Sequence, residues 1–294
     1  MKSVKILLLS VVAAILTSCG TTSTVPITGR KQNLLVSDEQ VLSLSNQQYQ
    51  EYMASAKKST NATNTALVKR VGQNLANAVV SYLNANGLGA EVSQYQWEFN
   101  LVQDTQINAF CMPGGKIVVY EGLLPVTQDE ASLAIVLGHE IAHAVAKHSA
   151  ERLSNAYRQQ YGIQVLGAVA SGMGASSSMV QLGQIVAGAG GQFFTAGFSR
   201  KQESEADHMG LVFAAMAGYD PSVAVGFWQR MSQATGGGSS SLLSDHPSDA
   251  ERISDIQKWI PEAKKYYRPA NAATTTTTTT SSKKKKTTKT IKIK

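Results

Sequence analysis

Hydrophobic positions in the first half of the chain predict helices followed by a small sheet. Apolar residues recur at helical spacing over residues 37–58 and 64–86, which predicts two amphipathic helices. Short alternating or apolar runs then predict strands at residues 95–102, 107–112 and 116–120. A Pro-Gly-Gly sequence between the last two strands predicts a turn.

A helix that is apolar on nearly all sides is expected next. Thr127 and Glu130 have the spacing of a capping box, so we expect this helix to begin near Thr127 and run to about Leu153. Residues 162–191 are rich in Gly, Ala and Ser and are expected to be flexible or partly helical, too interrupted for a transmembrane hairpin. The last predicted helices cover residues 200–217, 221–233 and 247–260, and Pro261 is expected to end the third.

Composition excludes several classes of protein. Of the 294 residues, 43% are hydrophobic, which is enough for a sizeable core, and two cysteines exclude a disulfide scaffold. The net charge of +7 arises at the chain ends, because residues 1–18 and 272–294 hold nine of the 27 Lys and Arg and no acid. Residues 19–270 therefore hold 18 bases and 20 acids, and no nucleic-acid partner is expected.

The N-terminal residues predict a membrane anchor. Residues 1–18 have two lysines followed by a short apolar stretch, which is typical of a secretory signal peptide. Leu16-Thr17-Ser18-Cys19 resembles a bacterial lipobox, in which Cys19 is acylated; the alternative is an ordinary signal peptide with a chance cysteine. Gly20 rather than Asp after Cys19 favours the outer membrane, facing the periplasm.

These patterns divide the chain into four parts. Residues 1–18 are the expected signal peptide, and residues 19–36 a lipidated linker. Residues 37–262 form the expected folded domain. Residues 263–294 end in a Thr- and Lys-rich sequence of low complexity and are expected to be disordered.

The predicted buried helix contains the sequence His139-Glu140-Ile141-Ala142-His143. His139 and His143 lie one turn apart on one helix face, so both can bind one metal ion, and Glu140 can reach a water molecule there and act as a base. The flanking residues 134–137 and 144–146 are apolar. Since burying these polar groups without partners would be costly, the context favours a zinc site over a chance match.

A third ligand must come from elsewhere in the chain. His148 is nine residues after His139, about half a turn off the ligand face of a continuous helix, which favours a surface or supporting position. Glu203 and Asp207 share one face of a later helix, so one can bind zinc while the other hydrogen-bonds a ligand histidine. Glu205 is expected to face solvent or to pair with Arg200 or Lys201.

Five motifs together resemble the M48 (Ste24/HtpX-like) zinc metallopeptidases. They lie at residues 25–30, 108–115, 139–143, 199–207 and 246–253. The similarity is to the periplasmic lipoprotein branch that includes LoiP and BepA, without the C-terminal helical-repeat domain of the BepA type. It implies an α+β fold, a mainly helical gluzincin (zincin-like) domain with a small β-sheet beside the active-site helix.

The resemblance also implies the roles of site residues. Zinc would be held by His139, His143 and Glu203, with Glu140 as the catalytic base and Asp207 hydrogen-bonded to a ligand. His246 and Arg252 belong to the late motif and are further catalytic candidates. His246 could donate to the oxyanion of the reaction intermediate or could occupy the open zinc position and inhibit the enzyme.

The expected substrate-binding strand is the one that precedes the Pro-Gly-Gly turn. An edge strand pairs with the backbone of an extended peptide, which suits unfolded substrates. Its candidate residues are Asn108, Ala109, Phe110, Pro113 and Gly114.

Together these features predict a lipid-anchored zinc endopeptidase, and the resemblance to the lipoprotein branch implies that it degrades unfolded or misassembled envelope proteins. The alternative is a self-inhibited or chaperone-like zinc-binding lipoprotein with little proteolysis. The base Glu140 argues against a chaperone, because a purely structural zinc site needs none.

Overall fold

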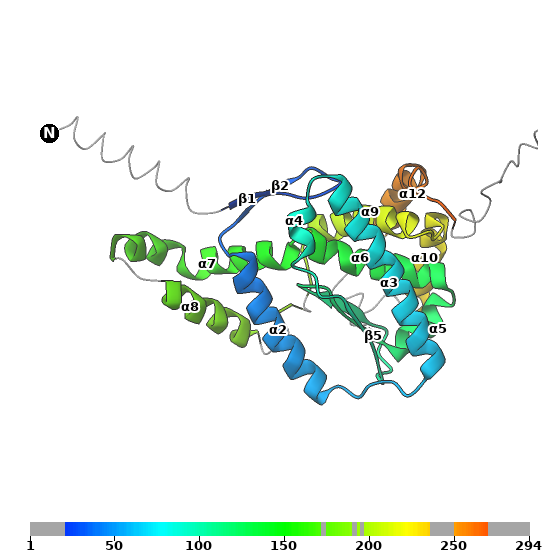
Figure 1. The fold of residues 1–294 in the computed structure, drawn as a ribbon, viewed down its shortest axis with the longest axis horizontal. Coiled ribbons are helices and arrows are strands. Elements are labelled where there is room, and N and C mark those ends of the chain that lie inside the picture. The colour runs from blue at the N-terminus through cyan, green and yellow to red at the C-terminus, as the bar shows by residue number, and fades with distance from the viewer. Residues whose placement is uncertain (1–20, 172–174, 190–192, 195–196, 236–249, 270–294) are drawn as a thin grey trace, which may run out of the picture.

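The computed structural model describes most of the chain between residues 21 and 269 (Figure 1). The expected signal peptide, Cys19, His246 and the sequence from residue 270 lie outside the described residues. The described ranges are 21–171, 175–189, 193–194, 197–235 and 250–269.

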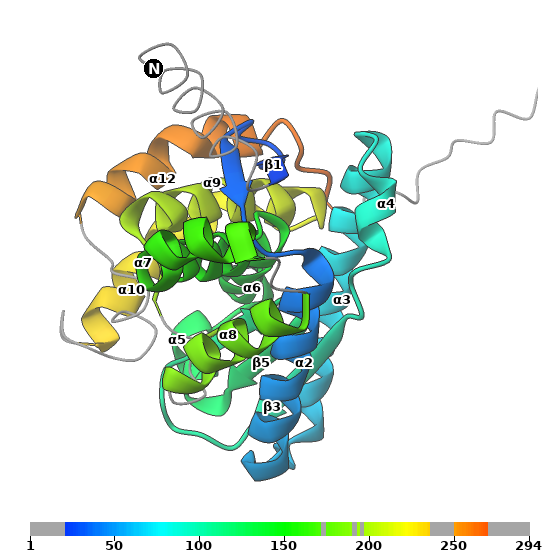
Figure 2. The ribbon, with the colours of Figure 1, turned by 90° about the vertical axis from the view of Figure 1, so that its left-hand side faces the viewer.

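Helices surround a small central sheet (Figures 1 and 2), so the α+β class expected from the sequence is confirmed. The strands are β1 (Thr21–Thr24), β2 (Lys31–Leu34), β3 (Glu98–Val102), β4 (Ala109–Met112) and β5 (Lys116–Tyr120). The early helices are α2 (Asp38–Ser55), α3 (Ala62–Ala85), α4 (Gly89–Val92), α5 (Leu124–Thr127) and α6 (Glu130–Val145), with the 3₁₀ turn η1 (Glu121–Leu123) before α5. The later ones are α7 (His148–Ser171), α8 (Ala175–Gly188), α9 (Arg200–Met216), α10 (Ala224–Ala234) and α12 (Ala250–Ala263), with η2 (Pro221–Val223) before α10.

The three-stranded sheet has the order β3-β5-β4, with β4 at one edge. β3 is parallel to β5, and β4 is antiparallel to it. The predicted turn joins β4 to β5, and Gly114 and Gly115 have φ angles of 88° and 83°. Only glycine adopts this region without strain, which explains the Gly-Gly pair.

Both faces of the sheet are covered, which explains why every residue of β4 and β5 is buried. Ile117 and Val119 belong to the core shared with α3 and α6. Val118 and Tyr120 face the second core, which includes residues of α2 and α8. The successive side chains of β5 thus fill two opposite cores, as the period of a strand requires.

The helix α6, which contains the His139–His143 motif, begins two residues later than the capping-box spacing predicts. Asp129 is the N-cap residue, and its carboxylate accepts a hydrogen bond from the Ser132 backbone N–H at 2.7 Å. Thr127 instead ends the short helix α5, where its hydroxyl donates to the Leu124 carbonyl. The predicted start at Thr127 was wrong because Gln128, with a φ of 66°, separates the two helices.

α6 also ends earlier than predicted. It stops at Val145 instead of running to Leu153, and α7 starts at His148. Lys147, between them, has a left-handed φ of 56°, which breaks the helix. The change of direction decides where His148 lies.

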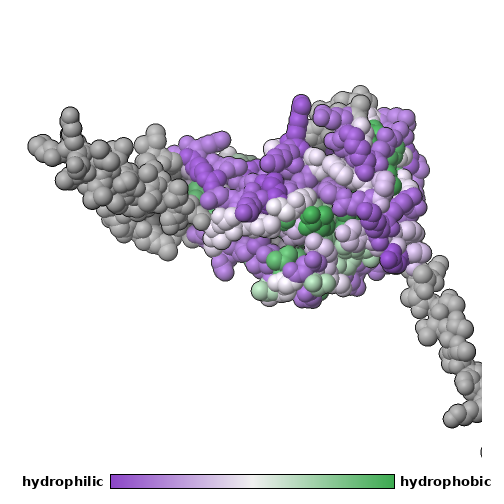
Figure 3. Space-filling view, turned by 90° about the horizontal axis from the view of Figure 1, so that it is seen from above, coloured by the Kyte–Doolittle hydropathy of each residue, from purple (hydrophilic) through white to green (hydrophobic). Residues whose placement is uncertain are grey.

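α7 and α8 cover most of the Gly- and Ala-rich region, which is therefore largely helical. Within the described residues, the helices are all too short or too polar to cross a bilayer. Figure 3 shows the molecule from above, relative to the view of Figure 1. On this side the surface of the described residues is mostly hydrophilic, with small separate hydrophobic patches.

Three predicted boundaries need correction. Residues 21–36, expected to be a linker, contain the β1–β2 hairpin, and Val25 is buried in the main core. The prediction that Pro261 ends the last helix was wrong: α12 continues through it to Ala263, and the Lys264 N–H donates to the Ile260 carbonyl at 2.9 Å. The fold extends past the predicted start of the tail at residue 263, since Tyr267 packs against the core.

Candidate metal centre

The predicted zinc-binding motif lies in the middle of α6. His139, Glu140 and His143 are each 2% exposed, so the motif is inside the protein. α6 is buried on nearly all sides, between β4, α3 and α9. Buried histidines require polar partners, and His139 and His143 find theirs on helices α7 and α9.

Glu203 reaches the two histidines from the first turn of α9. Ser199 caps this helix and forms a capping box with Gln202, which fixes where α9 begins. Farther along, α9 crosses α6 at two glycines: a Cβ on Gly210 would lie 2.7 Å from the His139 backbone nitrogen, and one on Gly138 would lie 2.7 Å from the Gly210 carbonyl. This close approach brings Glu203 to the histidines.

The donor atoms of His139, His143 and Glu203 have the spacing that zinc requires. Their two Nε2 atoms are 3.0 Å apart, and the Glu203 oxygens lie 3.3 Å from His139 Nε2 and 3.5 Å from His143 Nε2. Tetrahedral ligands at about 2.0–2.1 Å from zinc lie about 3.3 Å from one another. Two imidazoles and a carboxylate are also a donor set that suits zinc, so these residues fit the ion.

Behind His139 lies a carboxylate that holds its orientation. Nδ1 of His139 is 2.9 Å from Asp207 Oδ1, and the Arg252 guanidinium donates to the same oxygen at 2.6 Å. Burial alone would raise the pKa of Asp207, but Arg252 and His139 outweigh it and lower that pKa. Burial also disfavours the charged form of His139, which would lower its pKa. Hydrogen bonds and charge from Asp207 and Glu203 outweigh this effect and raise the pKa to about 9. The carboxylates around His139 therefore favour a positive charge at this point of the protein.

Arg252 lies behind the ligand rather than beside the expected reaction site. Its guanidinium contacts Asp207 and sits 3.5 Å above the centre of the Trp228 ring. Arg252 is thus placed to orient Asp207 and, through it, His139. Arg252 was predicted as a catalytic residue, whereas these contacts indicate a residue that positions a metal ligand.

His148 is a buried neighbour of His143. Its side chain is fully buried, and its Nδ1 lies 2.8 Å from His143 Nδ1. Of the two positions considered for His148, the structure excludes the surface one and agrees with the supporting one, because the break at Lys147 turns His148 back toward α6. The Phe198 ring stacks against the His143 ring, with ring centres 4.0 Å apart, and its centre lies 5.9 Å from that of His148.

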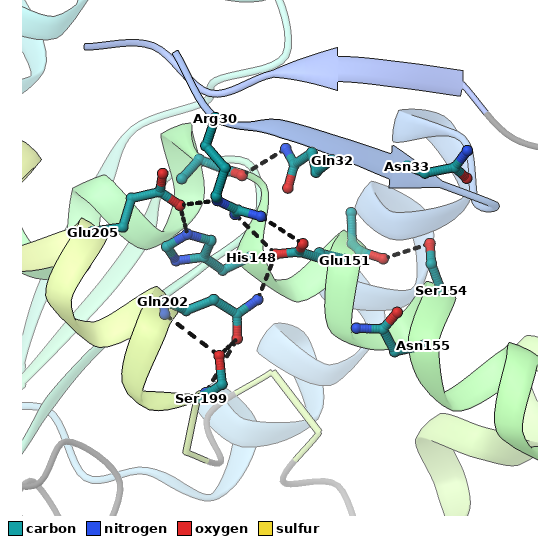
Figure 4. Close-up of polar contacts among 12 residues, drawn as sticks. Arg30, Gln32, Asn33, His148, Glu151, Ser154, Asn155, Ser199, Gln202 and Glu205 are labelled. Atoms are coloured by element: carbon teal, nitrogen blue, oxygen red, sulfur yellow. Dashed lines mark hydrogen bonds and ion pairs between the residues drawn. The ribbon is translucent and has the colours of Figure 1, made fainter. Parts of the chain in front are cut away.

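Glu205 is buried, although it was expected to face solvent or pair with Arg200 or Lys201. Its Oε2 accepts from His148 Nε2 at 3.0 Å and from Arg30 Nε at 2.7 Å (Figure 4). Thr28 donates to its other oxygen. The predicted pairing failed because these partners are distant in sequence, although the motif at residues 25–30 had already drawn attention to Thr28 and Arg30.

The predicted substrate-binding residues lie just before β4, on it and on the turn that follows it. Ala109 and Phe110 are buried, and the Phe110 ring packs edge-on against Tyr52 of α2. Asn108 is half-buried, and its side chain accepts from the Ala109 N–H at 2.9 Å. Pro113 and Gly114 line a small pocket that His143 also lines. The structure thus places the turn near the metal centre.

A cavity of about 240 Å³ lies beside the site between α9 and α12. Its lining includes Glu203, Asp207 and Arg252, so it reaches both the third ligand and the groups behind His139. Glu251 and Asp255 also line it.

Comparison with known proteins agrees with this arrangement. A profile described as peptidase family M48 matches residues 69–260, which include all three candidate ligands and Glu140. The chain belongs to peptidase family M48. The family and the zincin-like fold expected from the sequence are confirmed, and zinc is the metal that this family uses.

Similar M48 peptidases occur in bacteria and in mitochondria. The chain is 41% identical over 175 residues to the mitochondrial metalloendopeptidase OMA1 of Schizosaccharomyces pombe, across 59% of this chain and 49% of that protein. It is 33% identical over 253 residues to OMA1 of Bos taurus, across 84% and 47%. The metalloprotease LoiP of Escherichia coli is 29% identical over 222 residues, across 76% and 81%. The chain spans about half the length of these OMA1 proteins.

Proposed function

We propose that this M48 protein is a zinc endopeptidase of the bacterial envelope that cleaves unfolded or misassembled proteins. The observation that carries the proposal is the trio of donor atoms 3.0–3.5 Å apart, with Glu140 next to one of them on the same buried helix. The names of the similar OMA1 and LoiP proteins support proteolysis.

His139, His143 and Glu203 would hold the zinc ion, which supplies Lewis-acid polarisation of the substrate carbonyl and of water. The Glu140 carboxylate takes a proton from the attacking water and delivers it to the nitrogen of the leaving amine. Asp207 accepts from Nδ1 of His139, so the proton of the ring lies on Nδ1 and the Nε2 lone pair can bind metal. His246 stays a predicted oxyanion donor or inhibitory ligand.

An extended substrate would bind along β4. The Tyr120 N–H donates to the Asn108 carbonyl, so residue 108 faces β5 and the backbone groups of Ala109 and Cys111 turn toward the other edge. Pairing with backbone rather than side chains would give the broad specificity that unfolded clients require. Methylating the backbone nitrogens of a model peptide one at a time should raise KM at alternate positions only. Equal effects at every position would contradict strand pairing.

The envelope location rests on the signal-peptide and lipobox patterns of residues 1–19. Cys19→Ser should release the protein from the membrane fraction and abolish incorporation of a labelled fatty acid. A Cys111→Ser variant is the matched control, and it should stay anchored.

Proteolysis is tested by removing and restoring the metal. The purified full-length protein should bind one zinc ion per chain and cleave an unfolded model protein. A chelator should stop cleavage, and one equivalent of zinc should restore it. Zinc binding without any cleavage would favour the self-inhibited or chaperone-like alternative, and folded protein that binds no metal would contradict the assignment.

A further inference from the structure

The hydrogen-bond partner of His143 is unusual for a metal ligand, because it is another histidine. His139 meets a carboxylate directly, through Asp207. His143 instead meets Nδ1 of His148, whose Nε2 meets Glu205. His139 thus contacts its supporting carboxylate directly, whereas His143 is connected to Glu205 through the side chain of His148.

A metal ion held by Nε2 of His143 would fix every proton in this chain of contacts. His143 must keep a lone pair on Nε2 for the metal, so its Nδ1 carries the proton and donates to His148 Nδ1 across 2.8 Å. His148 then carries its own proton on Nε2 and donates it to Glu205 across 3.0 Å. The three side chains form one directed relay that ends in a carboxylate.

The N-terminal hairpin, residues 21–34, holds the end of this relay (Figure 4). Arg30 donates from Nε to Glu205 at 2.7 Å and from both terminal nitrogens to Glu151 of α7. Thr28 donates to the second oxygen of Glu205. The hairpin therefore fixes the Glu205 carboxylate with two donors.

The same hairpin also fixes the point where the chain turns back toward His143. The Gln32 side chain donates to the Ala146 carbonyl at 2.9 Å, at the end of α6 and next to the left-handed Lys147. The hairpin thus contacts α6, α7 and α9, which carry His143, His148 and Glu205 respectively.

We propose that the N-terminal hairpin is a structural part of the metal centre: through Glu205 and His148 it positions His143 and so sets the affinity for zinc. The inference rests on the proposed zinc site, but not on the protein being an active peptidase. His148 and Arg30 are positioning residues, since neither is among the candidate ligands.

The test measures the zinc affinity of the full-length protein by competition with a chelating dye. In His148→Gln the side-chain amide lies near the place of Nε2, so it can donate to Glu205 but offers no acceptor to His143. In His148→Asn the amide oxygen lies near the place of Nδ1 and can still accept from His143. We expect His148→Gln and Arg30→Gln to weaken zinc binding about 10- to 100-fold, as loss of a ligand's supporting partner does, and His148→Asn to weaken it less.

The matched control is Arg158→Gln. Arg158 also ties the hairpin to α7, through the backbone and side-chain oxygens of Asn33 at 2.7 and 2.8 Å, but it lies outside the relay. It should change zinc affinity less than twofold. Thermal unfolding of the metal-free proteins shows which variants fold, and Arg30→Gln carries the test if both His148 variants unfold.

Two results would overturn the inference: parental zinc affinity in His148→Gln, or equal affinity in Arg30→Gln and Arg158→Gln. Either could occur while the parent still cleaves substrate, so the proposed peptidase activity would survive. Conversely, if the parent binds zinc but cleaves no substrate, the proposed peptidase activity is contradicted. The role of the relay in zinc affinity can still be measured in that case.

Discussion

The Arg252 guanidinium donates a 2.6 Å hydrogen bond to the Asp207 carboxylate, and both side chains are buried. The pair joins α12 to α9 directly behind the ligand His139. Arg252 is thus needed to keep an ionised Asp207 in place at depth.

Arg252→Gln should destabilise the fold by about 3 to 5 kcal/mol, because it leaves Asp207 buried without its cation. Chemical denaturation measures this loss. Arg252→Gln with Asp207→Asn removes both charges and should recover part of the stability, but not the zinc affinity, because His139 loses its carboxylate. Full additivity of the two single losses would contradict a coupled pair.

Gly210 sets the distance between the two metal-binding helices. Gly210→Ala should cost about 2 to 3 kcal/mol and weaken zinc binding, since its Cβ would lie within 3 Å of three backbone atoms of Gly138 and His139. Gly183→Ala on α8 is the control: no atom lies within 4 Å of its Cβ, and the change should stabilise the helix by about 0.5 kcal/mol. Similar changes in stability and zinc affinity in both variants would contradict the close contact of α6 and α9 at Gly210.

Cys111 should be unreactive in the folded protein. The thiol lies in the core beside α6, and burial, together with the charge of Glu140, raises its pKa well above the ordinary value. A thiol reagent at pH 8 should label it only after unfolding, which mass spectrometry can follow. Rapid labelling of native Cys19→Ser protein would contradict the buried position.

Acid should weaken the contact between the N-terminal hairpin and α7. Burial would raise the pKa of Glu151, but hydrogen bonds from Arg30 and Gln202 outweigh it and bring the pKa below its ordinary value of 4.5. A carboxyl with a depressed pKa stabilises the fold above its unfolded pKa and loses that contribution as pH falls through the folded value.

The stability of the parent should therefore fall more steeply below pH 4.5 than that of Glu151→Gln. Urea unfolding from pH 7 to pH 3 measures the difference. Parallel curves for the two proteins would show that Glu151 contributes nothing to the pH dependence.

Local patterns were enough to predict the centre of the site. His139, Glu140 and His143 share one helix, and Glu203 and Asp207 share another, so helical spacing alone places each pair on one face. The resemblance to M48 peptidases was needed to assign Glu203 rather than Asp207 as the ligand. The structure agrees, since Glu203 approaches both Nε2 atoms and Asp207 approaches Nδ1.

A supporting position for His148 was one of two that the sequence allowed, but the contacts of the relay could not be predicted, because they depend on one backbone angle. Lysine has no strong preference for the left-handed region, so nothing in the sequence marks Lys147 as the break that redirects His148. Glu205 was misplaced for a related reason. Its partners Thr28 and Arg30 come from a hairpin far away in sequence.

Replacing Glu140 tests the central claim most directly. Glu140→Gln should bind one zinc ion per chain but cleave an unfolded model protein at least about 100-fold more slowly than the parent, because an amide cannot take the proton. The matched control is Glu130→Gln on the same helix, whose side chain is partly exposed and pairs with Arg70. It should cleave at the parental rate. Equal cleavage by Glu140→Gln and Glu130→Gln would contradict the assignment of Glu140 as the base.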